Sequence, residues 1–134
     1  MASSAEGVTP LADDPDIPLV LLDTNALFMP FQMGLDLEQE IGREMGRCRI
    51  TVPQVVLAEL NAIKGSVKDG PAAFQYAKRF DTVPTEGLGD DAIVDCAQRT
   101  GGIVVTGDRE LIKRLRAEGL KVLRPRQRKR LELR

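Results

Sequence analysis

Short apolar runs alternate along the chain with longer stretches in which apolar and polar residues share a helical period. The runs at 17–22 and 103–106 are apolar on both faces, which is typical of strands buried in a parallel sheet. Shorter strands are predicted at 49–52, 82–83 and 121–123. Helices are predicted at 26–31, 37–45, 54–63, 71–80, 90–99 and 109–117. Because strands and helices alternate throughout, we expect an α/β domain with a mainly parallel sheet.

The two ends of the chain differ in composition from the part between them. Residues 1–16 are small, polar, acidic and proline-bearing, and we expect a disordered leader there. Residues 126–134 are strongly basic, and we expect a charged tail. The remaining residues, 17–125, fit one domain, since the whole chain has 134 residues.

The amino-acid composition excludes several kinds of catalytic and metal-binding site. The chain has no histidine, which excludes Ser-His-Asp catalysis, Cys-His catalysis and zinc sites with histidine ligands. With no tryptophan and one tyrosine, a large aromatic surface for stacking bases is not expected. Cys48 and Cys96 are too few for a structural zinc site, and we expect two free thiols in a reducing, cytoplasmic compartment. The chain shows no signal-peptide pattern and no apolar run long enough to span a membrane, so we expect no membrane partner.

The net charge of −1 combines two unlike parts of the chain. Residues 1–108 hold 8 basic and 17 acidic residues, a net charge of −9, whereas residues 109–134 hold 11 basic and 3 acidic residues, a net charge of +8. One interpretation of the basic part is a solvated surface without a partner. The other is a surface that binds the phosphate backbone of RNA. The candidates for that role are Arg109, Lys113, Arg124, Arg126, Arg128, Lys129 and Arg130.

Acidic residues follow the two most apolar strands. Asp23 comes directly after the run at 17–22, and Asp108 comes shortly after the run at 103–106. Ligands of parallel α/β sheets bind beyond the carboxyl ends of the strands, which makes both acids candidates for a site. The plainer interpretation is that each of them only caps the helix that follows.

Two predicted helices carry further carboxylates. Glu59 lies in a helix that is apolar almost all round, so it either sits at a rim or faces a cleft. Asp90, Asp91 and Asp95 lie in the first turns of the helix predicted from residue 90, with Asp91 and Asp95 on one face. The alternative for these three is a solvated face whose negative charges favour the helix N-terminus.

Separated carboxylates without histidine match one chemistry well. Oxygen ligands of this kind hold hard divalent cations such as Mg²⁺ or Mn²⁺, and crowded negative charges need such a cation. A divalent cation lowers the pKa of a bound water and stabilises negative charge at phosphorus. We therefore expect metal-assisted hydrolysis of a phosphodiester.

Four segments resemble the motifs of the PIN-domain nucleases and occur in that family's order. They are VLLDTNALF at 20–28, VVLAELNAI at 55–63, GDDAIVDCA at 89–97 and VVTGDRELIKRL at 104–115. The final GLKVLRPRQRKRLEL at 119–133 is similar to an archaeal subgroup related to ribosomal-RNA-processing nucleases and VapC-type toxins. The resemblance covers about residues 17–125 and implies a three-layer α/β/α sandwich with a central, mainly parallel sheet.

The resemblance also implies an acidic pocket that binds Mg²⁺ or Mn²⁺ and cleaves RNA endonucleolytically. The acids that match the catalytic and metal-binding positions are Asp23, Glu59, Asp91 and Asp108. Further candidate metal ligands are Asp90 and Asp95, and the small polar residues that would orient the acids are Asn25 and Thr106. Gly107 departs from the pattern, because many family members carry Asn at that position.

Two functions are compatible with these residues. The first is a metal-dependent endoribonuclease that acts in rRNA processing or as a VapC-type toxin, with RNA and either a ribosome precursor or an antitoxin as partners. The second is a non-catalytic RNA-binding or ribosome-assembly factor that keeps the same scaffold. Separately, the apolar cluster that follows the first motif is either core or a homodimer contact; it consists of Phe28, Met29, Phe31 and Met33.

Overall fold

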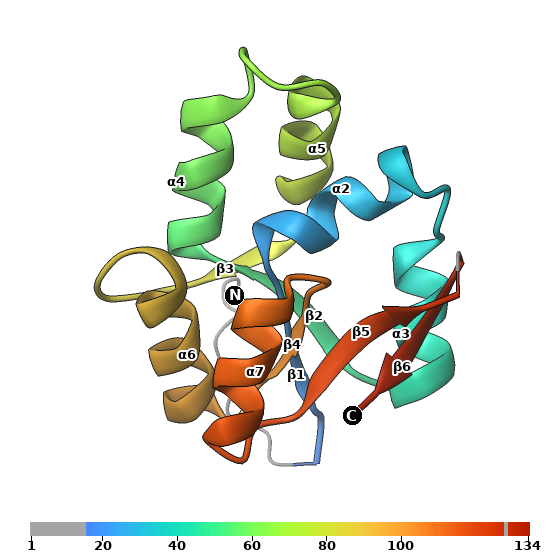
Figure 1. The fold of residues 1–134 in the computed structure, drawn as a ribbon, viewed down its shortest axis with the longest axis vertical. Helices are drawn as coiled ribbons and strands as arrows, with labels where there is room; N and C mark the ends of the chain where they lie inside the picture. The colour runs from blue at the N-terminus through green and yellow to red at the C-terminus, as the bar shows by residue number, and fades with distance from the viewer. Residues whose placement is uncertain (1–15, 128) are drawn as a thin grey trace, which may run out of the picture.

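The computed structural model describes residues 16–127 and 129–134 and places a six-stranded sheet at the centre of the domain (Figure 1). The strands are β1 (Leu19–Leu22), β2 (Arg49–Pro53), β3 (Asp81–Val83), β4 (Ile103–Val105), β5 (Val122–Arg126) and β6 (Arg130–Leu133). Their order across the sheet is β3-β2-β1-β4-β5-β6. All neighbouring strands are parallel except β5 and β6, which are antiparallel. The expected mainly parallel sheet is therefore confirmed.

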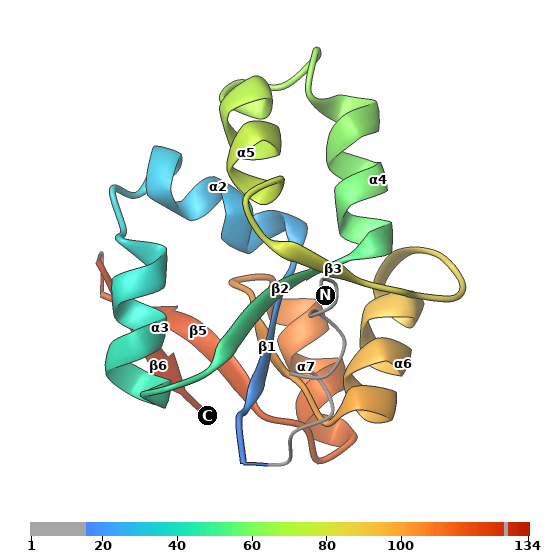
Figure 2. The ribbon, with the colours of Figure 1, turned by 180° about the vertical axis from the view of Figure 1, so that it is seen from behind.

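Helices lie on both faces of this sheet. They are α2 (Thr24–Gln32), α3 (Leu37–Met45), α4 (Gln54–Ile63), α5 (Gly70–Ala77), α6 (Gly89–Thr100) and α7 (Arg109–Ala117). In Figure 1, α6 and α7 stand in front of the sheet and α3 lies behind β5 and β6. Figure 2, seen from behind, shows α3 in front instead, with α2, α4 and α5 beyond the upper edge of the sheet. This arrangement agrees with the expected three-layer α/β/α sandwich. None of the helices in residues 16–127 and 129–134 has both the length and the apolar character needed to cross a membrane.

The centre of the sheet forms the core because its strands are apolar on both faces. All four residues of β1 are buried, and so are Val104 and Val105 of β4 beside it. Leu111 and Leu115 of α7 pack into the same core and are at most 1% exposed. Burying each such side chain contributes about 2 kcal/mol of hydrophobic stabilisation. Because β1 and β4 pair with each other inside this core, their carboxyl ends are held side by side.

The basic segment at 126–134 is not a tail in this structure, which corrects the prediction from its charge. Residues 122–126 and 130–133 pair as an antiparallel hairpin, and Leu131 is 1% exposed. Helix α3 holds this edge strand: the Leu131 N–H donates to Glu40 Oε1 over 3.0 Å, and the Leu131 carbonyl accepts from Arg43 Nη2 over 2.9 Å. The predicted disordered leader lies outside the described residues except for Asp16.

The apolar cluster after the first motif divides between core and surface. Phe28 and Met29 are buried in the core, as the first interpretation predicted. Met33 is half-buried, and Phe31 is 40% exposed and meets Tyr76 edge-on, with 6.1 Å between ring centroids. Cys48 and Cys96 are both free thiols.

Candidate active site

Asp23 occupies the point where β1 ends and α2 begins. Its main chain continues the sheet, with the Asp23 N–H 3.3 Å from the Val105 carbonyl of β4. Its side chain caps α2, because Oδ1 accepts the Ala26 N–H over 2.8 Å. Asp23 is 4% exposed, so the same carboxylate that caps the helix is also removed from water. Asp23 is therefore a helix cap, as the plainer interpretation predicted, and it is also a buried acid at a strand end.

Burial raises the pKa of Asp23 from 3.8 to about 7. Hydrogen bonds from the Thr106 side chain and the Ala26 N–H lower it, but by less than burial raises it. The nearby carboxylates of Asp108 and Asp90 raise it further, because each negative charge disfavours another. Near neutral pH, a cation bound beside Asp23 therefore stabilises the ionised form of its carboxylate.

Asp108 directly precedes α7 and is linked to Asp23 through one threonine. Asp108 Oδ1 caps α7 by accepting the N–H groups of Glu110 over 2.9 Å and Leu111 over 3.3 Å. The Thr106 hydroxyl oxygen accepts the Asp108 N–H over 3.0 Å, and the same side chain hydrogen-bonds to Asp23. Thr106 is completely buried, so its position is fixed by packing as well as by these bonds. It places the two strand-end acids relative to each other.

Asn25 and Gly107 form a second link between the first and fourth motifs. Asn25 Oδ1 accepts the Gly107 N–H over 2.7 Å. A Cβ atom at position 107 would lie 2.8 Å from that oxygen, a separation at which something must shift. Glycine at 107 therefore permits the close approach of Asn25, which gives a physical reason for the departure from the family pattern at this position.

Glu59 faces the same region from α4. Its Oε1 accepts a hydrogen bond from the hydroxyl of Thr24, in the first turn of α2. This bond crosses between two helices, so it turns the exposed Glu59 side chain toward the strand ends. Of the two positions considered for Glu59, the structure shows the one that faces a cleft.

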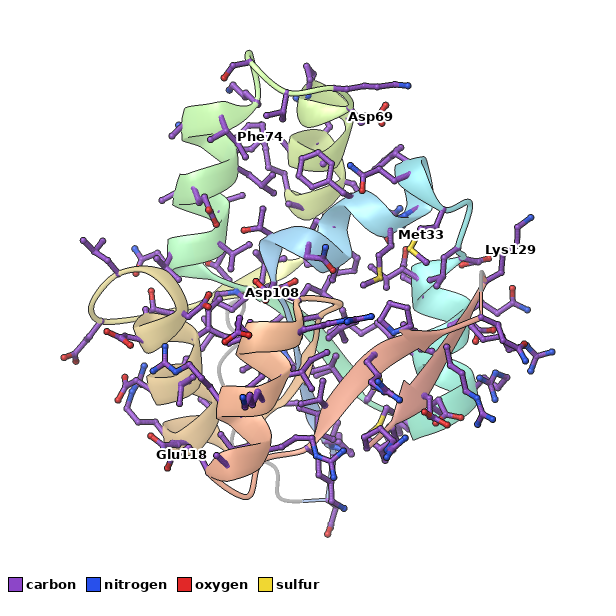
Figure 3. The ribbon with its side chains drawn as sticks, in the orientation of Figure 1. Met33, Asp69, Phe74, Asp108, Glu118 and Lys129 are labelled. Atoms are coloured by element: carbon purple, nitrogen blue, oxygen red, sulfur yellow. The ribbon has the colours of Figure 1, made fainter. Side chains whose placement is uncertain are left out.

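A pocket of about 270 Å³ collects these side chains. It is lined by Asp23, Thr24, Asn25, Glu59, Asp90, Ile93 and Asp108. Asp23, Glu59 and Asp108 come together as the motifs predicted, each from a different part of the chain. Figure 3 shows Asp108 at the start of α7, facing the gap between that helix and the upper helices.

The third acid in the pocket is Asp90 rather than Asp91. Asp91 points away, with its side chain 82% exposed and its Oδ1 paired with Arg114 Nη2 over 2.8 Å. Asp90 is half-buried, and burial together with the charge of Asp108 raises its pKa. Asp95 also lies outside the pocket lining and pairs with Arg99 over 2.8 Å.

The donor set of this pocket fits a divalent cation. Across the described ranges, no three acidic or cysteine side chains are already grouped so that they could hold a metal ion. Four carboxylates nevertheless line one small pocket, and Asp108 and Asp90 raise the pKa of Asp23 by their proximity. Carboxylate oxygens of this kind are the ligands that Mg²⁺ and Mn²⁺ prefer.

The basic candidates divide into two groups. Arg109 and Lys113 are exposed on α7, directly after Asp108. Arg124, Arg126, Lys129 and Arg130 belong to the β5–β6 hairpin, and Figure 3 shows Lys129 at the far edge of the molecule, well away from Asp108. Arg128 lies outside the described residues. The basic candidates therefore lie in two separate places, on the helix that follows Asp108 and on the hairpin.

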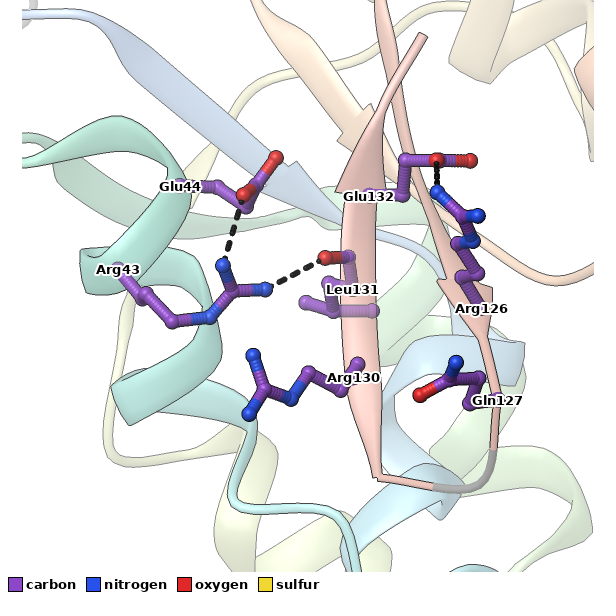
Figure 4. Close-up of a pocket in the computed structure, with 7 residues that line it drawn as sticks. All are labelled: Arg43, Glu44, Arg126, Gln127, Arg130, Leu131 and Glu132. Atoms are coloured by element: carbon purple, nitrogen blue, oxygen red, sulfur yellow. Dashed lines mark hydrogen bonds and ion pairs between the residues drawn. The ribbon is translucent and has the colours of Figure 1, made fainter.

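A cavity of about 440 Å³ lies between α3 and this hairpin and is larger than the acidic pocket (Figure 4). Three arginines line it, Arg43, Arg126 and Arg130, together with two carboxylates. Arg126 pairs with Glu132 over 2.6 Å, and Glu132 also pairs with Arg124 and Arg134. Much of the positive charge on the hairpin is thus balanced locally, which leaves Arg130 as the arginine of this cavity without an ion pair within 4.0 Å among the described residues.

Comparisons with known proteins agree with this geometry. The model of a family described as "PIN like domain" matches residues 20–128. Ribonuclease VapC9 of Archaeoglobus fulgidus is 27% identical over 107 residues, which cover 76% of this chain and 78% of that protein. The structure of the PIN domain endonuclease Utp24 superposes with a TM-score of 0.73 at 27% identity, over 85% of this chain and 90% of that one. The VapBC2 complex of Rickettsia felis, solved with a promoter DNA fragment, gives 0.63 at 16% identity, over 81% and 99%.

Proposed function

The chain belongs to the PIN-like domain family, as its four motifs predicted, and on this premise we propose that it is a metal-dependent endoribonuclease. The observation that carries the proposal is the meeting of four carboxylates in one pocket at the strand ends. A ribonuclease and an endonuclease, each 27% identical to this chain, support the same activity.

We assign the metal-binding role to Asp23, Glu59, Asp90 and Asp108, with Mg²⁺ or Mn²⁺ as the ion. Asp90 replaces Asp91 in this set because it lines the pocket, whereas Asp91 pairs with Arg114 outside it. When bound, such an ion lowers the pKa of water and stabilises the negative charge that develops at phosphorus.

The remaining side chains of the pocket position these acids. Thr106 and the Ala26 N–H hold the Asp23 carboxylate, and Thr106 also fixes the start of α7. Thr24 directs Glu59 toward the pocket. Arg109 and Lys113, exposed on the helix that follows Asp108, are placed to bind phosphates of an RNA backbone beside the site.

The test is cleavage of single-stranded and structured RNAs with Mg²⁺, with Mn²⁺ and with EDTA. We expect cleavage only with metal, and a loss of at least about 100-fold in Asp23→Asn, Glu59→Gln and Asp90→Asn. Asp91→Asn and Asp95→Asn are matched controls, because they remove the same charge from the same helix outside the pocket, and they should retain most activity. Undiminished cleavage by Asp23→Asn or in EDTA would overturn the proposal. RNA binding without metal-dependent cleavage would instead favour a non-catalytic RNA-binding or assembly factor.

Two biological roles follow from the relatives, and they differ in their partners. If the enzyme processes ribosomal RNA, the RNA crosslinked to it in cells should be a ribosome precursor, with cleavage at a mature end. If it is a VapC-type toxin, its expression alone should stop growth, and the product of a neighbouring gene should restore it. In either role we propose that it acts in the cytoplasm.

A further inference from the structure

We propose that an apolar cavity beside the acidic pocket binds one unpaired nucleobase of the RNA, next to the phosphate that is cleaved, and that Leu88 forms the outer wall of this base site. The inference rests on the proposed function and adds to it a subsite for one base of the substrate. Neither the motifs nor the assigned acids include Leu88.

The cavity lies between α4 and the start of α6 and has a volume of about 340 Å³. Most of its lining side chains are aliphatic, and the two charged ones are both negative. The residues that line it are Val55, Val56, Ala58, Glu59, Leu88, Gly89, Asp90 and Ile93. A concave, mainly apolar site with a few polar groups is the usual form of a site for a small organic group.

This cavity adjoins the acidic pocket. Glu59, Asp90 and Ile93 line both spaces, so the two share a wall made of α4 and α6. In a nucleotide the base is joined to the phosphate through the sugar. When the phosphate lies at the acids, the base is therefore close to that wall. The cavity is therefore where a neighbouring base can be accommodated while its phosphate is held at the acids.

Leu88 is the most exposed large apolar side chain in the described ranges, at 82%, against 40% for Phe31 and Val67. It lies in the loop between β3 and α6, which projects beside α6 in Figure 1. Gly87 and Gly89, with φ of 84° and 60°, bracket it in the left-handed region, where glycine is favoured. The fold thus presents a leucine to solvent at the rim of an apolar cavity, where it has little to contribute to the core.

The loop that carries Leu88 is anchored on both sides. The Thr85 hydroxyl accepts the Val55 N–H at the start of α4 over 3.0 Å. The Pro84 carbonyl accepts from Arg99 Nη2 of α6 over 3.3 Å. These bonds hold the start of the loop against the same two helices that form the cavity, and Leu88, three residues after Thr85, lies in the cavity lining.

The chemistry of the cavity favours a base over the other parts of RNA. The aliphatic side chains offer a surface for the flat apolar face of a base, whereas the described residues of the lining include no basic group that would bind a phosphate. In a duplex, neighbouring base pairs cover that face, so the base that enters must be unpaired. Because the walls are aliphatic, the contact does not depend on aromatic residues, and none lines the cavity in the part of the chain that the structure describes.

The test combines Leu88→Ala with an RNA oligonucleotide that lacks one base. After the cleavage position is mapped on single-stranded RNA, an abasic nucleotide is placed in turn on each side of it. We expect the wild-type kcat/KM to fall about 10-fold at one of the two positions, chiefly through KM. Leu88→Ala should lose about as much on intact RNA and nothing further on the abasic RNA, and Leu88→Met should behave like wild type. Val67→Ala removes another exposed aliphatic side chain and is the matched control.

An equal penalty for the missing base in wild type and in Leu88→Ala would overturn the base site, and so would unchanged cleavage of intact RNA by Leu88→Ala. In the second case the exposed leucine would serve a protein partner instead. If no metal-dependent cleavage is found, the proposed function fails, but the base site is still decided by binding. Fluorescence anisotropy with the same oligonucleotides should then show affinity that depends on the base and on Leu88 together; affinity that depends on neither refutes the site.

Discussion

Replacing Asp23 with Asn should stabilise the metal-free protein at pH 8, although it removes an acid that we place in the active site. Burial leaves the Asp23 carboxylate 4% exposed and raises its pKa from 3.8 to about 7. Asn keeps a side-chain oxygen that can cap α2 by accepting the Ala26 N–H, and it carries no charge. The substitution therefore removes the cost of a buried charge and retains the cap.

The size of the effect follows from the raised pKa. Each pKa unit corresponds to about 1.4 kcal/mol, so the change from 3.8 to about 7 corresponds to roughly 4 kcal/mol. Above pH 7 the carboxylate is ionised in both the folded and the unfolded chain, and the folded state bears this full cost. Between about pH 4 and pH 7 the folded chain keeps a proton that the unfolded chain releases, so the contribution of Asp23 to stability falls as the pH rises.

The assay is urea unfolding of wild type and Asp23→Asn in EDTA, at several values between pH 4 and pH 8. The gain in unfolding free energy from the substitution should be near zero at pH 4 and grow to about 4 kcal/mol at pH 8. Asp36→Asn is the matched control, because it exchanges the same residue types at the exposed N-cap of α3, and it should change stability little. A difference between wild type and Asp23→Asn that is the same at pH 4 and pH 8 would refute the reasoning.

Three further predictions concern the metal and two backbone contacts. Mn²⁺ should raise the Tm of wild type at pH 8, and raise it much less in Asp23→Asn, when unfolding is followed by circular dichroism. Glu40→Ala should lower the unfolding free energy by about 1–3 kcal/mol in urea, because the Leu131 N–H loses its acceptor, and Glu40→Gln should cost less. Gly107→Ala should cost about 1–3 kcal/mol in the same assay and lower the cleavage rate, because its Cβ would lie 2.8 Å from Asn25 Oδ1; unchanged stability and rate would contradict this.

The fold was predictable because its strongest local signals agree with its tertiary structure. The run that became β1 is apolar on both faces, and only the middle of a covered parallel sheet buries such a strand. The helix predicted at 37–45 has the same bounds in the structure, where Asp36 Oδ1 caps α3 by accepting the Gln39 N–H over 3.2 Å. At these positions the local sequence pattern and the packing of the whole domain favour the same strand or helix.

The last strand was missed because charge concealed its pattern. In β6, Leu131 and Leu133 alternate with Arg130 and Glu132, which is a strand period of two, but the segment is too short and too basic for that period to stand out. What fixes it is a distant helix: Glu40 and Glu44 of α3 accept the N–H groups of Leu131 and Leu133. Such partners are about 90 positions away in the chain, so no local pattern can indicate them.

The choice between Asp90 and Asp91 shows the same limit within the site. Neighbouring residues of a helix point about 100° apart, so two adjacent aspartates in the first turn cannot both face one pocket. The motif places both at the start of α6 and cannot say how far that helix is rotated about its axis. Rotation is set by the packing of the buried face of α6, which leaves Asp90 in the pocket and Asp91 on the outer side, where it pairs with Arg114 of α7. Because Asp108 caps α7 and Asp90 lies in the first turn of α6, the pocket depends on α6 and α7 keeping their relative positions.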